Sequence, residues 1–194
     1  MALLGAMGYV VEGYDKFSIT EVDTMNANAQ MDMLVSHATD GSKIYVRYHV
    51  TDKATGAKLQ KLEDMVHDIF EKHELQKETD TLMVVVDDEP NDSSRLKQQK
   101  WYEQEGLFVV VHALARLQFN LLDHVLVPAA VRLSPEDAAA FRLAYHVQDN
   151  SQLPEIKRFD PLALAICLRP GQVCRLTRKS PTAMVTHYYR LCVA

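Results

Sequence analysis

Three consecutive acidic residues are the first feature of this sequence whose residue types could do chemistry. Asp87, Asp88 and Glu89 directly follow the apolar run 81–86. Carboxylates at the carboxyl end of a buried strand are the ligands that many α/β proteins offer to metal ions. An exposed acidic turn explains the same residues more simply, so we prefer the turn and keep the metal site as its alternative.

A second pattern has the spacing that metal-dependent nucleases use. Glu155, Ile156 and Lys157 form the one acid-x-lysine pair in the chain, in which a carboxylate would fix an ion and the lysine would polarise water or phosphate. Such pairs lie on strands. This one follows Pro154 and has no apolar run around it, so we expect a solvated loop or a helix end rather than a catalytic strand.

Two further groupings are weaker. His67 has Glu63 and Glu71 four residues away on either side, which could place three ligands on one helix face, but exposed ion pairing is the expected arrangement. A serine, a histidine and an aspartate could be drawn into a triad, but no G-x-S-x-G elbow is present; they are Ser180, His187 and Asp160. We therefore expect no catalytic residue, no metal ligand and no cofactor.

The composition is that of a folded protein. Of the 194 residues, 47 % are hydrophobic and 24 % charged, which argues against disorder. The sequence offers neither an apolar membrane-spanning run nor a signal peptide, so we expect a soluble, intracellular chain. Cys167, Cys174 and Cys192 are odd in number and fit no C-x-x-C spacing, which predicts core thiols rather than a disulfide framework or a zinc site.

The charges divide the chain in two. Residues 1–122 hold 12 basic and 20 acidic side chains, a net charge of −8, whereas residues 123–194 hold 9 and 6, a net charge of +3. No acidic residue follows Asp160. Five basic residues lie in that segment: Arg169, Arg175, Arg178, Lys179 and Arg190. They form either a solvated basic face or a patch that meets an acidic protein surface or nucleic acid.

Apolar spacing predicts an α/β layer over residues 1–120. Strands are expected at 31–37 and 43–50 with a turn at Asp40 and Gly41, and buried strands at 81–86 and 107–111. Amphipathic spacing predicts a helix over 57–75, and a polar helix over 93–105 ends at Gly106. Strands that alternate with helices favour parallel neighbours.

The second domain, 123–194, is expected to be a small α+β unit. Ser134 followed by a proline and two acids predicts a helix start, with the helix running to about Val147. Asp160 and Pro161 predict a second, short helix to 166, and residues 172–177 and 184–192 read as two closing strands. A domain of about 70 residues is marginally stable unless it docks on a partner.

The same region carries the pattern L-P-x-I-x-x-x-D-P-x-A at 153–163, then G-Q-V at 171–173, R-x-S-x-T-A at 178–183 and Y-R at 189–190. An H-x-L-V-P segment at 124–128 precedes it. This string resembles the C-terminal assembly domain of the fifth-largest shared subunit of eukaryotic nuclear RNA polymerases, whose family also includes an archaeal polymerase subunit. The family commonly has glycines where this chain has Cys167 and Met184, which predicts altered local turns.

The resemblance implies an α/β N-terminal domain with a restriction-endonuclease-like layout, and a C-terminal domain that packs on the largest polymerase subunit. The implied subunit-interface residues are Pro128, Pro154, Ile156, Asp160, Pro161, Ala163, Arg178, Ser180, Thr182, Ala183, Tyr189 and Arg190. The N-terminal domain would lie near downstream DNA, with Arg95, Lys97 and Lys100 as the DNA-proximal residues. Its acidic loop at 87–92 predicts weak, non-specific contact.

We therefore expect a non-catalytic, nuclear polymerase subunit that binds the largest subunit and other polymerase subunits, without a cofactor, a membrane or a second copy of itself. The chain is interpreted as a diverged copy of the family's subunit. Whether it is shared among polymerases or specific to one class, for example polymerase I, stays open. The alternatives are a nuclease-like metal-dependent enzyme and a free DNA-binding regulator, although the N-terminal charge of −8 disfavours the regulator.

Overall fold

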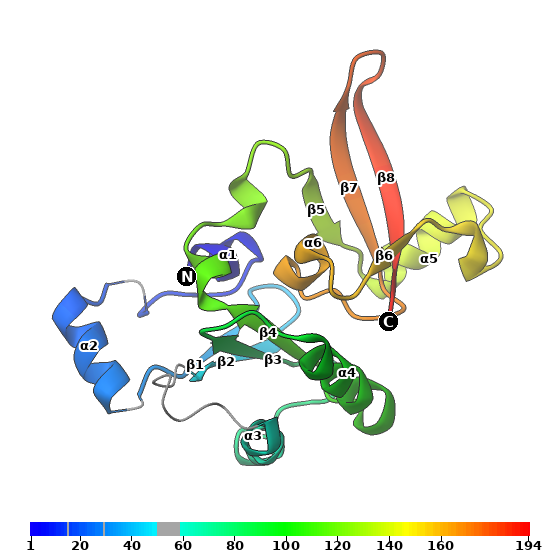
Figure 1. The fold of residues 1–194 in the computed structure, drawn as a ribbon. Coiled ribbons are helices and arrows are strands. Elements are labelled where there is room, and N and C mark those ends of the chain that lie inside the picture. Colours follow the sequence, from blue (N-terminus) through cyan, green and yellow to red (C-terminus); the bar gives the residue numbers. More distant parts are fainter. Residues whose placement is uncertain (15, 29, 50–58) are drawn as a thin grey trace. The chain divides into compact units, whose positions relative to one another are not determined.

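The chain forms two compact units, Met1–Phe119 and Asn120–Ala194. The computed structural model describes residues 1–14, 16–28, 30–49 and 59–194 (Figure 1). Two residues of predicted elements lie outside the described residues: Val50, the last residue of the strand predicted over 43–50, and Ala57, the first residue of the helix predicted over 57–75. The side chains of Leu59 and Leu62 also lie outside the described part of the chain.

The N-terminal unit is built on a four-stranded sheet in the order β1-β2-β3-β4. Its strands are β1 (Met33–Ser36), β2 (Lys43–His49), β3 (Thr81–Val86) and β4 (Val109–Ala113). β1 and β2 form an antiparallel hairpin, and β2, β3 and β4 run parallel, with Ile44 opposite Thr81 and Leu82 opposite Val109. The predicted hairpin at Asp40–Gly41 and the predicted parallel neighbours are confirmed.

The predicted helices supply the crossovers between the parallel strands. α3 (Leu59–Lys72) joins β2 to β3, and α4 (Asp92–Lys100) continues into a π-helical turn, Trp101–Glu105, before β4. Val66, Ile69 and Phe70 of α3 pack with Trp101 against one face of the sheet. The amphipathic spacing that predicted the helix therefore marks its core-facing side.

Strand β4 begins two residues later than the sequence predicted. Gly106 takes the left-handed conformation at φ 73°, and the Leu107 amide donates to the Trp101 carbonyl over 3.1 Å. Leu107 and Phe108 are buried, as the apolar run indicated, but the Leu107 amide closes the helix instead of joining the sheet. The buried segment thus begins at Leu107, whereas pairing with β3 begins at Val109.

Two short helices precede the sheet, α1 (Ala2–Ala6) and α2 (Ile19–Ala27). Ser18 and Glu21 form a capping box at the start of α2, in which each side chain bonds the other residue's backbone amide. None of the α2 residues is buried. The sequence patterns did not predict α2, because its apolar residues are few and its helical signal is the cap alone.

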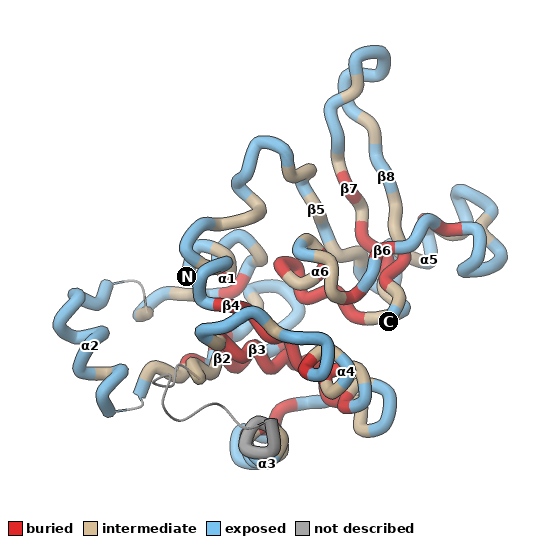
Figure 2. The backbone as a smooth tube through the Cα atoms, viewed as in Figure 1, coloured by how far each residue is buried: buried red, intermediate tan, exposed pale blue. Residues whose placement is uncertain are grey.

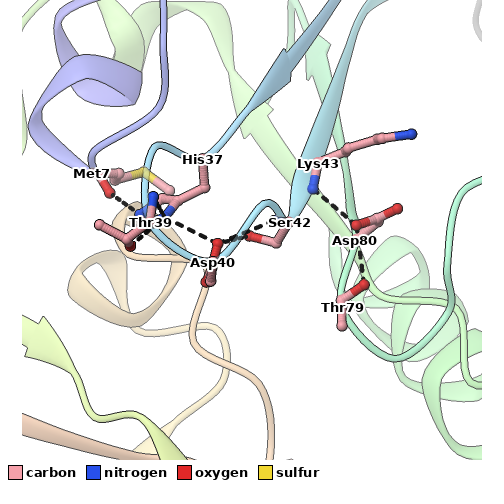
Figure 3. A network of polar contacts seen from close by, with 8 residues as sticks. All are labelled: Met7, His37, Thr39, Asp40, Ser42, Lys43, Thr79 and Asp80. Atoms are coloured by element: carbon pink, nitrogen blue, oxygen red, sulfur yellow. Dashed lines mark hydrogen bonds and ion pairs between the residues drawn. The ribbon is translucent and has the colours of Figure 1, made fainter.

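His37 ties the first residues of the chain to the β1–β2 hairpin (Figure 3). Its Nε2 lies 3.0 Å from the Met7 carbonyl oxygen and its Nδ1 3.0 Å from an Asp40 carboxylate oxygen. A side chain at Gly8, where φ is 90°, would come within 2.9 Å of the imidazole. Only glycine fits that position at no steric cost, so the imidazole fixes how closely this segment approaches the hairpin.

Asp80 performs a similar task at the same turn, where β2 begins (Figure 3). It is only 3 % exposed. Its carboxylate accepts the backbone amides of Lys43, at the start of β2, and of Gln76, both at 2.8–2.9 Å. These bonds satisfy a buried charge and join the segment before β3 to the strand beside it.

The C-terminal unit has its own four-stranded sheet in the order β5-β7-β8-β6. The strands are β5 (Ala129–Arg132), β6 (Glu155–Lys157), β7 (Val173–Ser180) and β8 (Met184–Val193), and the helices are α5 (Pro135–Ala144) and α6 (Pro161–Ala165). β7 and β8 are the two predicted closing strands, and they form one long antiparallel hairpin. β5 pairs antiparallel with β7, and β6 pairs parallel with β8.

Helix α5 is shorter than the sequence predicted. Its cap is as expected, since the Ser134 hydroxyl accepts the Asp137 amide, but the helix ends at Ala144 rather than near Val147. His146 has φ 53°, a left-handed conformation that ends the helix. The Val147 amide then bonds back to the Arg142 carbonyl.

Candidate subunit-docking surface

Both faces of the C-terminal sheet are packed, and this decides which of the family-matched residues can reach a partner. Cys174, Leu176 and Cys192 face α6 in one cluster, and Val173 and Leu191 face α5 in another. The buried positions gather where the four strands lie side by side, as the tube coloured by burial shows (Figure 2). The far part of the β7–β8 hairpin is exposed.

Ile156 and Ala163 do not lie on the surface. They are 5 % and 1 % exposed and belong to the cluster under α6. The resemblance placed both among subunit-interface residues, but their side chains are used to build the fold. We therefore keep them as core residues and not as contact residues.

Asp160 and Pro161 start α6 in the way their types predict. The Leu162 amide donates to the Asp160 carboxylate over 2.9 Å, and Pro161 occupies the first turn, where a missing amide hydrogen costs nothing. Asp160 is partly exposed and Pro161 exposed. Capping is thus their observed role, and a contact role is compatible with their exposure.

The R-x-S-x-T-A segment forms the tip of the hairpin. Ser180 pairs with Met184 across the turn, and the Ser180 hydroxyl accepts the Ala183 amide and lies 3.3 Å from the Thr182 hydroxyl. Thr182 and Ala183 are exposed. These contacts shape the turn, and they hold the Ser180 hydroxyl in a structural bond.

Tyr189 and Arg190 lie nearer the body of the unit. The Tyr189 ring stacks on Phe141 of α5, with ring centroids 3.9 Å apart and an angle of 20° between the planes. The Arg190 guanidinium donates to the Glu155 carbonyl of β6 over 3.1 Å. Both side chains stay partly exposed while holding α5 and β6 to the hairpin.

The exposed part of the hairpin combines cations with apolar side chains. Arg178 lies over the Tyr188 ring at 5.2 Å, and Lys179 is exposed beside it. Met184 is 82 %, Val185 54 % and Tyr188 48 % exposed. We call residues 178–188 the distal ribbon. A ribbon of this composition is the kind of surface that docks on a protein.

The linker before β5 is also exposed and apolar. Val125 and Leu126 of the H-x-L-V-P segment are 96 % and 85 % exposed, and Pro128 is partly exposed. Pro154, before β6, is exposed as well. Leu126 and Pro128 match the family's linker, but only Pro128 was named as an interface residue, and Val125, whose apolar character in a linker was the available signal, was not singled out.

The three cysteines are core thiols, as predicted. All three are free and buried. Burial raises the pKa of Cys167 and of Cys192 to about 12, and it also raises the pKa of Cys174. Thiols kept protonated in this way are poor nucleophiles and poor metal ligands.

The acidic residues after β3 form a turn with one ion pair. The Arg116 guanidinium donates two hydrogen bonds of 2.9 Å to the Glu89 carboxylate, and these bonds lower the pKa of Glu89. Asp87 and Asp88 are exposed. Over the described residues, no group of three histidine, cysteine, aspartate or glutamate side chains has the geometry to hold a metal ion.

The other candidate sites separate in the structure. His67 pairs with Glu105 at 3.4 Å, while Glu63 pairs with Lys97 at 3.0 Å. Of the three residues that could be drawn into a triad, each has its own partner: Asp160 caps α6, His187 Nδ1 lies 3.3 Å from the Thr177 hydroxyl, and the Ser180 hydroxyl accepts the Ala183 amide.

The acid-x-lysine pair does lie on a strand, contrary to our expectation of a loop or helix end. Glu155, Ile156 and Lys157 form β6, because Pro154 and the residues after it pair with β8. Glu155 and Lys157 point away from the buried side of the strand and are exposed. A three-residue strand of this kind is defined by its neighbour and not by its own pattern.

The three DNA-proximal residues differ in how freely their charges could reach phosphate. Arg95 pairs with Asp92 at 3.4 Å and Lys97 with Glu63 at 3.0 Å. Lys100 is exposed, and among the residues the structure describes it has no ion pair. The positive charges of Arg95 and Lys97 are thus paired with acidic side chains of the same unit.

None of the helices that the structure describes is both long and apolar enough to cross a membrane.

The C-terminal unit is thus a small α+β unit whose sheet is packed on both faces and whose hairpin ends in an exposed ribbon. The family model described as RNA polymerase Rpb5, C-terminal domain, matches residues 119–192. Those residues coincide with the C-terminal unit almost from end to end.

Curated relatives agree with this match. DNA-directed RNA polymerase subunit Rpo5 of Thermococcus kodakarensis is 46 % identical over 79 residues, 41 % of this chain and 95 % of the relative. The proteins of the same name from Pyrococcus abyssi and Archaeoglobus fulgidus are 43 % and 42 % identical over 76 and 77 residues, 39 % and 40 % of this chain and 92 % and 100 % of each relative. The chain belongs to the Rpb5 family of RNA polymerase subunits.

Proposed function

We propose that this protein is a structural subunit of a DNA-directed RNA polymerase, anchored on the largest subunit through its C-terminal unit. The observation that carries the proposal is the match over residues 119–192, a segment that folds as a unit of its own. Relatives named as polymerase subunits have a length close to that of this unit alone. This agreement in length supports an anchor in the part of the chain that the relatives share.

The surface chemistry supports a protein partner with acidic groups. The C-terminal unit has no acidic residue after Asp160, and its distal ribbon displays Arg178 and Lys179 beside exposed apolar side chains. Complementary charge fixes orientation and excludes wrong partners, while apolar contact supplies free energy. The subunit-interface residues that remain candidates are those with exposed or partly exposed side chains.

In the same proposal the N-terminal unit flanks downstream DNA with a restriction-endonuclease-like layout and no catalytic role. The parallel β2-β3-β4 core with helical crossovers is compatible with that layout. Since Arg95 and Lys97 are already paired with acids, contact with phosphate would be weak and would depend on the assembled enzyme. Nuclear localisation and specialisation for one polymerase class, for example polymerase I, are the finer parts of this proposal.

The test is purification of the full chain through an affinity tag, with identification of the proteins that accompany it. We expect the two largest polymerase subunits in equal amounts with the tagged chain. Recovery of the folded chain without them would refute the proposal.

A charge reversal in the same experiment tests the surface. Arg178→Glu should reduce the recovered polymerase by about tenfold or more, because like charges at an interface cost several kcal/mol. Lys157→Glu, an exposed reversal on β6 away from the ribbon, is the matched control and should leave recovery within about twofold, as expected for a surface charge. Equal losses in both variants would place the recognition elsewhere.

A further inference from the structure

The β7–β8 hairpin is longer than the strands beside it. β5 pairs with β7 over Cys174–Thr177, and β6 pairs with β8 over Leu191–Val193 only. Within the C-terminal unit, residues 184–190 of β8 therefore have no strand on their outer side. Figure 1 shows the hairpin extending beyond both neighbours.

The direction of each backbone group on β8 follows from two hydrogen bonds. The Leu191 amide donates outward to the Pro154 carbonyl over 2.9 Å, and the Cys192 amide donates inward to the Gln172 carbonyl over 2.8 Å. Because successive residues of a strand alternate, the amides and carbonyls of His187 and Tyr189 also point outward. The amides and carbonyls of Thr186 and Tyr188 point inward and form hydrogen bonds with β7.

Over Val185–Tyr189 this outer edge has no proline and no Lys, Arg, Asp or Glu, the residue types that most often keep strand edges from pairing. Edges are commonly protected by proline, by charged residues, by bulges or by a covering element. The edge of β7 beyond Thr177 carries Lys179, but the edge of β8 carries Val185, His187 and Tyr189, with no proline in the strand. Val185 and His187 are exposed.

Charge indicates the kind of strand that would fit. Arg178 and Lys179 lie across the hairpin from Thr186 and Val185, and the whole segment after Asp160 is free of acids. A basic second strand would meet like charges here, whereas an acidic one would be attracted. The partner strand should therefore carry aspartate or glutamate among apolar residues.

We propose that the outer edge of β8, over Val185–Tyr189, pairs with an extended acidic segment of another polymerase subunit, which adds a strand to this sheet. The inference rests on the proposed function and specifies its mode of contact. In such pairing, main-chain hydrogen bonds supply affinity and the alternating side chains supply specificity.

Amide hydrogen exchange with single-residue resolution tests the proposed strand pairing directly. In the isolated full chain the amides of His187 and Tyr189 should exchange fast, and those of Thr186 and Tyr188 should already be protected by β7. In polymerase purified through the tagged chain, the first two amides should slow by about tenfold or more, as for any amide that enters a stable strand pair. Unchanged exchange at His187 and Tyr189 in the assembled enzyme would overturn the inference and leave the proposed function intact.

Two variants of His187 separate the contribution of its backbone amide from that of its side chain. His187→Pro removes an outward amide hydrogen, which an open edge tolerates, so the free chain should keep its melting temperature within about 4 °C while polymerase recovery falls about tenfold. His187→Ala keeps the amide and removes only the side chain, so it should lose clearly less recovery than His187→Pro. Equal recovery with both variants would contradict pairing at this edge.

Two other occupants of the edge are outcomes of the same tests. If a second copy of the chain paired there, light scattering would show a dimer of the free chain and the outward amides would be protected before assembly. If nucleic acid bound the ribbon through its cations, nuclease treatment of the polymerase would release the protection at His187 and Tyr189. Either result would refute pairing with an acidic strand.

Discussion

Two residues hold backbone conformations that suit glycine better. Cys167 and Met184 have φ of 48° and 56°, and these are the positions where the family commonly has glycine. We expected the substitutions to alter the turns. That expectation stays a prediction; in this chain both residues take the left-handed conformation with a side chain in place, which is strained relative to glycine.

Restoring glycine should therefore act differently at the two positions. Met184→Gly should raise the free energy of unfolding by about 0.5 kcal/mol, because relief of about 1–2 kcal/mol of left-handed strain exceeds the added chain entropy of about 0.5–1 kcal/mol. Cys167→Gly should give no gain, since its side chain is 1 % exposed and its loss leaves a cavity. Urea denaturation followed by circular dichroism measures both, and a loss of stability in Met184→Gly would show that the turn is not strained.

Asp160 provides a second test at the residue scale. Asp160→Ala should lower the free energy of unfolding by about 1 kcal/mol, because the Leu162 amide loses its acceptor. Asp160→Asn keeps an acceptor oxygen and serves as the control, with most of the stability retained. If neither the melting temperature nor polymerase recovery changed in Asp160→Ala, the cap would have no part in folding or assembly.

The buried thiols predict a pH dependence. In the folded chain burial raises the pKa of Cys167 and Cys192 to about 12, so these thiols stay protonated while the unfolded chain loses its thiol protons near the ordinary pKa of 9.0. The contribution of the protonated thiols to the free energy of unfolding is complete below pH 9, and it is lost as the pH rises from 9 toward 12. A thiol reagent at pH 8 should label the native chain slowly and all three cysteines in urea, and fast native labelling would show that the thiols are open to solvent.

At the scale of elements, length decided what the sequence could predict. The helices over 59–72 and 135–144 and the strands over 81–86, 173–180 and 184–193 carry a local signal, which is amphipathic spacing, a helix cap or an apolar run. β5 and β6, with four and three residues, do not. They become strands by pairing with β7 and β8, which is a tertiary effect that no local pattern contains.

At the candidate docking surface, too, local sequence patterns did not contain the tertiary information. The motif residues were found, but the motif did not separate those that build the fold from those that face outward. Ile156 and Ala163 proved to be core, and Tyr189 and Arg190 hold α5 and β6 to the hairpin. The motif could not show how strongly Val125, Leu126 and Val185 are exposed, because exposure is a property of the packed unit.

The loop between β3 and α4 gives a prediction about an element. Replacing Asp87, Asp88 and Glu89 together with alanine should leave transcription by the assembled enzyme largely intact, because exposed ion pairs such as Glu89–Arg116 are screened by solvent. The measurement is run-off transcription with polymerase purified through the tagged variant, with subunit stoichiometry as its control. Lost activity at normal stoichiometry would reveal a metal or catalytic role for the turn.

At the scale of the whole molecule, charge and family match divide the chain at the same place. The first unit is acidic, and the second is basic and carries the match over residues 119–192. In the proposed function the basic unit binds the partner subunits, and the acidic unit lies near DNA that it would not bind alone.

The most direct test is to express residues 1–119 and 120–194 separately with the same tag and to measure the polymerase recovered with each. Circular dichroism of each fragment establishes which of them folds alone, since a domain of about 70 residues is marginally stable. We expect residues 120–194 to recover the largest polymerase subunit in amounts close to those of the full chain, and residues 1–119 to recover none above an untagged control. Recovery of polymerase by residues 1–119, with none by a folded 120–194 fragment, would contradict the assignment of the anchor.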